Sequence, residues 1–171
     1  MADKHPPIKG SGRVKHMNRV VRSLVAGIGL VTLAACAQPA MNDITEITVE
    51  RDCTGCATGS VLVLRRDGTA TLTVVGKARL ATQNSSSTGT VSRADFDALA
   101  KLAAAKGFFQ MQDSYDAADV QDGAWITTRV RGGTRDKQVL HRNAAGPEGL
   151  KQMEAAVAAL QARISFVPDR R

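Results

Sequence analysis

The 171-residue chain is poor in aromatic residues, histidine and cysteine, and each shortage argues against a class of function. A single Trp and a single Tyr leave few rings on which nucleic-acid bases could stack. A zinc site needs about four ligands, and His141 is the only histidine after residue 35. The chain also lacks a glycine-rich phosphate loop, a Gly-x-Ser-x-Gly elbow and a His-Glu-x-x-His segment. We therefore expect no enzymatic activity and no bound cofactor.

The formal net charge of +7 is concentrated near the N-terminus. Residues 1–35 hold six of the 23 basic residues and one of the 16 acidic residues, which leaves a net charge of +2 for residues 36–171. A nucleic-acid-binding domain ordinarily carries a basic surface. The nearly neutral second part of the chain therefore gives no support for nucleic acid as a partner.

A short apolar run, Leu24–Ala35, follows the basic residues and contains no charged side chain. A basic region, a short apolar region and small residues before a cleavage site together make up a secretory signal. The run is shorter than the roughly 20 residues that a membrane-spanning helix needs. A start at Met17 would give this signal an ordinary length.

The run closes with Leu33-Ala34-Ala35-Cys36, which resembles the bacterial lipoprotein signal, or lipobox, at all four positions. The resemblance implies a diacylglycerol cysteine at position 36, cleavage before it, and acylation of the new amino group by a fatty acid such as palmitate. Several acyl chains hold a protein firmly on a bilayer, at about 0.8 kcal/mol per buried methylene. Because Ala37 rather than Asp follows Cys36, the resemblance also implies the outer membrane, with the protein facing the periplasm. An ordinary cleaved signal is the alternative.

These features divide the chain into four expected segments. They are a signal peptide over residues 1–35, a lipidated tether over 36–43, one domain over 44–166 and a C-terminal tail over 167–171. The length after the signal is typical of a single domain. Such a domain can bury roughly two-thirds of its surface on folding.

Alternation of apolar and polar residues predicts three strands in the first half of this domain. One covers Ile44–Asp52, and a hairpin joins Ser60–Arg66 to Thr69–Val75 across Asp67-Gly68, a strong hairpin signal. A two-residue turn there would pair Val63 with Leu72. The residues then expected on one face of the hairpin are Val61, Val63, Ala70, Leu72 and Val74.

Further strands are expected on both sides of a serine-rich segment. Lys77–Gln83 alternates with Ala78 and Leu80 inward, whereas Asn84–Gly89 is expected to be a loop. A second hairpin joins Ala124–Arg131 to Thr134–His141 across Gly132-Gly133. Its expected register pairs Ile126 with Val139 and Arg129 with Asp136.

Two helices complete the predicted fold. Ser92 and Asp95 form a capping box at the start of the first, and Gly107 ends it. Pro147 occupies the first position of the second. The apolar positions at helical spacing are Phe96, Leu99, Leu102 and Ala103, then Leu150, Met153, Val157, Leu160 and Ile164. We predict an α+β fold with an antiparallel sheet of about five or six strands and two helices packed on one face.

Several short motifs follow one another in a fixed order along the domain. They are Glu50-Arg51, a close cysteine pair, Asp67-Gly68-Thr69, a serine-capped helix with Phe96, Gly107-Phe108-Phe109, an acidic loop with Tyr115, and Gly146-Pro147-Glu148-Gly149-Leu150. This order resembles a family of small exported bacterial domains of unknown function, over about residues 44–163. The resemblance supports the fold and supplies no activity or catalytic residue.

Cys53 and Cys56 form an even pair once Cys36 is assigned to lipid. In an oxidising compartment such a pair predicts a structural disulfide. Two-residue spacing also serves thiol–disulfide exchange, in which a helix N-terminus stabilises the thiolate, but no helical pattern follows Cys56. Redox exchange and metal handling are kept as alternatives.

An acid-rich loop is expected over Met111–Gly123. Its candidate residues for a ligand or a cation are Asp113, Tyr115, Asp116, Asp119 and Asp122. Carboxylates at every third residue could surround calcium, which takes six to eight oxygen ligands. The spacing does not match an EF-hand loop, and a solvated loop with local turns is the alternative, so no metal is assigned.

We expect a lipid-anchored lipoprotein of the cell envelope that acts as a non-enzymatic binding or structural module. Its partners would be the membrane, through acyl chains on Cys36, and an envelope protein or peptidoglycan. The alternative function is a periplasmic thiol–disulfide or metal-handling protein that uses Cys53 and Cys56. Basic residues that could meet an acidic partner, if they share a face, are Arg65, Arg66, Arg79, Arg129, Arg131 and Arg135. Alternation leaves open whether Trp125 is in the core or exposed.

Overall fold

The computed structural model of the chain describes residues 43–116 and 123–170. The expected signal peptide, Cys36, Asp119 and Asp122 lie outside these ranges. Within them, neither α-helix is long and apolar enough to cross a membrane.

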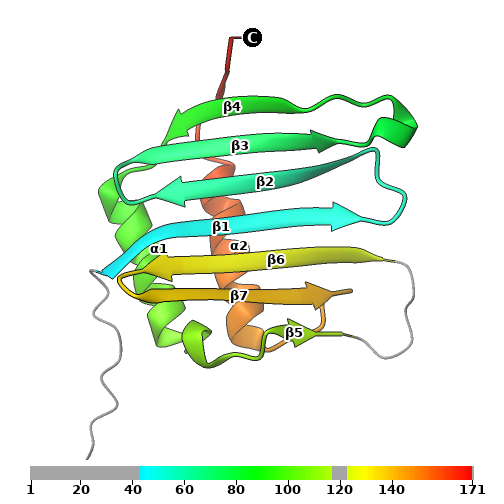
Figure 1. Cartoon of the computed structure of the whole chain (residues 1–171). Helices are drawn as coiled ribbons and strands as arrows, with labels where there is room; N and C mark the ends of the chain where they lie inside the picture. Colours follow the sequence, from blue (N-terminus) through cyan, green and yellow to red (C-terminus); the bar gives the residue numbers. More distant parts are fainter. Residues whose placement is uncertain (1–42, 117–122, 171) are drawn as a thin grey trace, which may run out of the picture. The chain divides into compact units, whose positions relative to one another are not determined.

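The domain consists of one sheet and two α-helices (Figure 1). The strands are β1 (Ile44–Cys53), β2 (Thr58–Arg65), β3 (Thr69–Gly76), β4 (Ser85–Thr90), β5 (Ser114–Tyr115), β6 (Ala124–Gly132), β7 (Arg135–Arg142) and β8 (Val167–Pro168). The helices are α1 (Arg93–Ala105) and α2 (Glu148–Gln161), with the short 3-10 helices η2 (Ala78–Leu80) and η3 (Phe108–Gln110). The strand order is β5-β7-β6-β1-β2-β3-β4-β8, and all neighbours are antiparallel except β5 and β7.

The predicted α+β class is confirmed, but the sheet has eight strands rather than five or six. Two of the additional strands, β5 and β8, contain only two residues each and lie at the edges of the sheet. Such short strands leave no alternation by which a sequence pattern could reveal them.

Both helices pack on the same face of the sheet (Figure 1), which we call the inner face; the other is the outer face. The core forms between the helices and the inner face, because apolar side chains alternate inward along the strands and recur at helical spacing in α1 and α2. Its largest fully buried side chains include Phe96, Phe108, Ile47, Leu62, Leu64, Leu150 and Met153.

The β2–β3 hairpin has a register one residue away from the predicted one. Its loop holds three residues rather than two, because Gly68 adopts a φ of 98° and donates its N–H to the Arg65 carbonyl at 3.1 Å. Leu72 therefore faces Leu62 rather than Val63. A one-residue shift exchanges the two faces of a strand. The side chains affected are Leu62 and Leu64, which are buried, and Val61 and Val63, which lie on the outer face.

The prediction for residues 77–90 was wrong in both parts. Ala78–Leu80 forms η2 rather than a strand, and Leu80 is 47% exposed rather than inward. The serine-rich segment, expected to be a loop, forms β4 along the free edge of β3. The same strand lies close to the segment after α2, since a Cβ at Gly89 would collide with the side chain of Ile164. Tertiary contacts decide the structure here, and local composition does not.

The remaining elements agree more closely with the predictions made from the sequence. Ser92 caps α1 by accepting the Asp95 N–H at 3.0 Å, and Gly107 has a left-handed φ of 66°. Pro147 is the N-cap of α2 rather than its first residue. The β6–β7 register differs from the predicted one by two residues, which preserves the faces. Arg129 is therefore opposite Gln138 rather than Asp136, with which it forms a diagonal ion pair.

The register of β2 makes a test of the fold. We expect Leu64→Ala to lower the free energy of unfolding by about 2–5 kcal/mol, because it removes a fully buried side chain. The neighbouring Val63→Ala on the outer face should cost less than about 1 kcal/mol. Urea unfolding followed by circular dichroism measures both. A larger loss for Val63→Ala would support the two-residue turn instead.

Candidate functional site

The two helices cover only part of the inner face. The ends of β1, β2, β3 and β6 that lie away from the β2–β3 turn extend past both helices (Figure 1). Inward-facing side chains at these ends are not buried by a helix. Arg51 is one of them, since it continues the inward alternation of Ile47 and Val49 along β1.

Two cavities of about 370 Å³ each open at this end of the sheet, and Arg51 and Ser60 line both. The first, the α2 cavity, is otherwise lined by Leu72, Ala158, Gln161, Ala162 and Phe166. The second, the disulfide cavity, is otherwise lined by Asp52, Cys53, Cys56, Thr58, Gly59, Val74 and Ala124. We call the two cavities together the Arg51 groove. Their size and mainly apolar lining are typical of small-ligand sites.

Arg51 is a half-buried cation at the junction of these cavities. Burial lowers the pKa of its guanidinium, and attraction to the Glu154 carboxylate acts in the opposite direction. Arginine nevertheless keeps its charge at neutral pH. The guanidinium makes no hydrogen bond or ion pair with any side chain in residues 43–116 and 123–170. A partly desolvated charge without a partner is unfavourable, so an anion in the groove would stabilise it.

The nearby Glu154 is only 7% exposed and is already fully engaged. Thr128 donates its hydroxyl to Oε1 at 2.8 Å, and Nε2 of His141 lies 2.8 Å from Oε2. This arrangement ties α2 to β6 and β7 through buried polar contacts. The Glu154 carboxylate is thereby held near Arg51 without pairing with it.

His141 is 4% exposed, and its Nδ1 has no hydrogen-bond partner among the described residues. A substrate in solvent would not reach either ring nitrogen or the Glu154 carboxylate. The structure therefore places His141 in a structural cluster, as its isolation in the sequence suggests. The role of Glu154 was missed, although a charged residue inside the apolar stripe of α2, between Met153 and Val157, could have indicated it.

Cys53 and Cys56 are joined by a disulfide, with their Cα atoms 5.3 Å apart. Cys53 is the last residue of β1, Gly55 turns the chain with a φ of 92°, and β2 begins at Thr58. No helix N-terminus is present to stabilise a thiolate in this part of the structure. The bridge borders the disulfide cavity.

Asp52 lies beside the groove but its charge is neutralised. Lys77 Nζ is 2.5 and 2.7 Å from the two carboxylate oxygens, and the Cys53 N–H donates to Oδ1 at 2.7 Å. The hydrogen bond from Lys77 is the main cause of the lowered pKa of Asp52. Lys77 also lies 5.9 Å from the centroid of Trp125, which is half-buried on the outer face.

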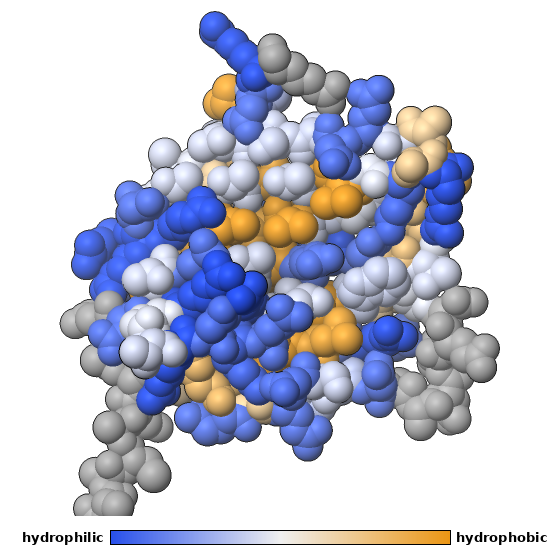
Figure 2. Space-filling view, viewed as in Figure 1, coloured by the Kyte–Doolittle hydropathy of each residue, from blue (hydrophilic) through white to orange (hydrophobic). Residues whose placement is uncertain are grey.

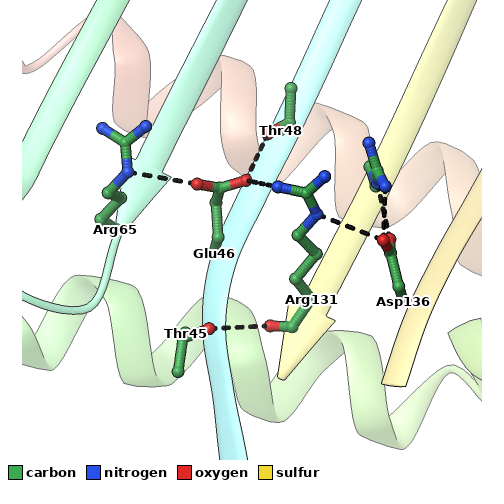
Figure 3. A network of polar contacts seen from close by, with 7 residues as sticks. Thr45, Glu46, Thr48, Arg65, Arg131 and Asp136 are labelled. Atoms are coloured by element: carbon green, nitrogen blue, oxygen red, sulfur yellow. Dashed lines mark hydrogen bonds and ion pairs between the residues drawn. The ribbon is translucent and has the colours of Figure 1, made fainter. Parts of the chain in front are cut away.

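The predicted arginines do not form a continuous basic surface. Three of them share the outer face in a network that alternates in sign across four strands (Figure 3). Glu46 accepts hydrogen bonds from Arg65 at 3.1 Å and Arg131 at 3.2 Å. Asp136 pairs with Arg131 and Arg129. Of the others, Arg66 pairs with Asp97, Arg135 lies over the Phe109 ring, and Arg79 is in η2.

Hydrophobic side chains come to the surface at the centre of the outer face (Figure 2). There β2 and β3 present Val61, Val63 and Val75, all half-buried, among threonines. The charged network lies at one end of the same face (Figure 3). This face therefore has no single charge sign.

The acidic candidates have separate partners. Asp113 pairs with Lys137, and Asp116 with Arg142 at 3.5 Å. The Tyr115 hydroxyl accepts the Gln112 N–H at 3.0 Å. In the part of the chain that the structure describes, no three His, Cys, Asp or Glu side chains are grouped to hold a metal ion.

A family model described as "Domain of unknown function (DUF6438)" matches residues 46–161, more than half of the chain. The matched range runs from β1 to the end of α2 and includes Arg51, both bridged cysteines and Glu154. No curated protein matches the chain.

The lowered pKa of Asp52 predicts a pH-dependent contribution to stability. The contribution is present above the ordinary value of 3.8 and is lost as the pH falls through the lower folded-state pKa. We expect Asp52→Asn to be less stable than the unmodified chain at pH 7, with the difference shrinking below about pH 4.

Urea unfolding at a series of pH values measures this difference. Since Lys77 is the main cause of the shift, the Lys77→Met background should remove most of it. A difference that does not change with pH would contradict the assignment.

Proposed function

We propose that this chain, which belongs to the family described as "Domain of unknown function (DUF6438)", is a non-enzymatic binding module of the bacterial cell envelope. Because the family description assigns no activity, the proposal rests on this chain's own residues. The observation that carries it is the Arg51 groove, where two apolar cavities meet and a half-buried cation makes no side-chain hydrogen bond or ion pair with the described residues. Such a site suits a small anionic ligand.

We further propose that the module is a lipoprotein anchored in the outer membrane through acyl chains on Cys36, facing the periplasm. The lipobox match at residues 33–36 and the Ala37 that follows support this placement. The described domain begins at Asp43. At about 3.5 Å per residue, the intervening segment spans roughly 25 Å at most, so the domain would lie close to the bilayer.

The thiol–disulfide alternative has less support. The cysteine pair occupies a turn between two strands, and β2 follows Cys56 almost directly. A structural bridge that closes the turn between β1 and β2 fits this position better than an exchanging one.

The anchor predicts the mass of the native protein. Protein extracted from its native membrane fraction should have a mass that begins at Cys36 plus three acyl chains, and reduction should add two hydrogens for the Cys53–Cys56 bridge. Intact-protein mass spectrometry measures both. An unmodified mass that begins at Met1 or Met17 would contradict the lipoprotein assignment.

The groove predicts anion binding that depends on Arg51. We expect the full chain in phosphatidylcholine nanodiscs to broaden the carboxylate ¹³C signal of labelled acetate. Arg51→Met should weaken this binding by about tenfold or more, since a hydrogen bond to a charged group contributes about 1.5–3 kcal/mol. Arg93→Met makes the same charge change on a side chain that is 69% exposed, and should have no effect. Equal loss in both variants would contradict the site.

A further inference from the structure

We propose that the Arg51 groove binds a single-chain acyl carboxylate, such as a fatty acid. The carboxylate head group would lie at Arg51 and Ser60, and the alkyl chain would lie in the α2 cavity. This inference rests on the proposed function of the groove and names the chemical class of its ligand.

The head-group position follows from the register of β1 and β2. Arg51 and Ser60 are direct cross-strand partners on the inner face, so their side chains start about 5 Å apart. A guanidinium presents donors in a planar fork that matches a carboxylate, and the serine hydroxyl can add one more donor. Two adjacent donors at the junction of the cavities are enough for one carboxylate.

The charge balance of the groove favours a ligand with one negative charge. Among the described residues that line the two cavities, Arg51 is the only cation. Asp52 is neutralised by Lys77, and Glu154 is held by Thr128 and His141. A phosphate dianion or a polyanion would therefore lack the additional cations that it needs.

The alkyl-chain position follows from the lining of the α2 cavity. Leu72 on β3 and Phe166 after α2 are half-buried and offer apolar surface. Ala158 on α2 and Ala162, the residue that caps the end of this helix, are exposed, and their small side chains leave room beside the helix. The disulfide cavity is less suitable because, among the described residues, its apolar lining is limited to Val74, Ala124 and the bridged cysteines, without a leucine or an aromatic side chain.

The test is a chain-length series on the full chain in phosphatidylcholine nanodiscs, with empty nanodiscs subtracted. The probes are acetate, butanoate, hexanoate, octanoate and the uncharged 1-octanol, and calorimetric titration gives each dissociation constant. We expect affinity to rise about two- to threefold per methylene from butanoate to octanoate, less than the roughly fourfold of complete burial because the groove is open. Octanol should bind at least tenfold more weakly than octanoate.

Four variants locate the two ends of the ligand. Arg51→Met should weaken octanoate binding about tenfold or more, and Arg51→Lys should retain most of it, which separates loss of charge from loss of folding. Ala158→Phe, which fills the α2 cavity, should remove the chain-length trend while acetate binding persists. Thr58→Phe fills the disulfide cavity from a position that is also exposed and should leave the trend intact.

The outcomes distinguish this inference from the function on which it rests. If acetate binds through Arg51 but affinity does not rise with chain length, the acyl class is overturned and the anion-binding function stands. A trend lost in Thr58→Phe but kept in Ala158→Phe would overturn the placement of the alkyl chain. Both proposals fail if no carboxylate binds. They also fail if Arg51→Met binds carboxylates as tightly as the unmodified chain and has the same melting temperature.

Discussion

Burial of one face of the sheet against two helices is the constraint on which the rest of this structure depends. The inner face must be apolar where α1 and α2 cover it, and Ile47, Leu62, Leu64 and Met153 fill that contact. The helices cross the strands and leave one end of this face uncovered (Figure 1). The same alternation that builds the core therefore continues beyond the helices, where it places Arg51 in a position that is partly desolvated and still open to solvent.

Glu154 and Arg51 carry opposite charges on the inner side of the sheet, and their surroundings differ. Glu154 lies fully inside and receives Thr128 and His141 on its two oxygens, which is how a buried carboxylate is normally accommodated. Arg51 lies at the open end and, in the part of the chain that the structure describes, is attracted by Glu154 without a hydrogen bond to it. The carboxylate thus lowers the cost of keeping a cation in the groove, and it leaves the donors of that cation available.

The sequence predicted best what depends on a few adjacent residues. The Ser92 cap, the Gly107 terminus and the inward alternation of β1 are local, and each is present. The β2–β3 register depended on one loop residue, and β4 on contacts with β3 and Ile164, which no local pattern contains. The bridge partners were identified, but the groove was not, because it arises where helices end relative to strands. The one feature of the sequence that could have indicated the groove was an arginine at an inward-facing position of β1.

The two edge strands have a consequence for how this domain can associate. A long unpaired edge offers a row of free backbone donors and acceptors to any passing strand, and this is a common route to aggregation. Here β8 and the following Asp169 N–H occupy part of the edge of β4, while β5 occupies part of the edge of β7. Both edges therefore offer fewer free backbone groups for edge-to-edge polymerisation of this domain.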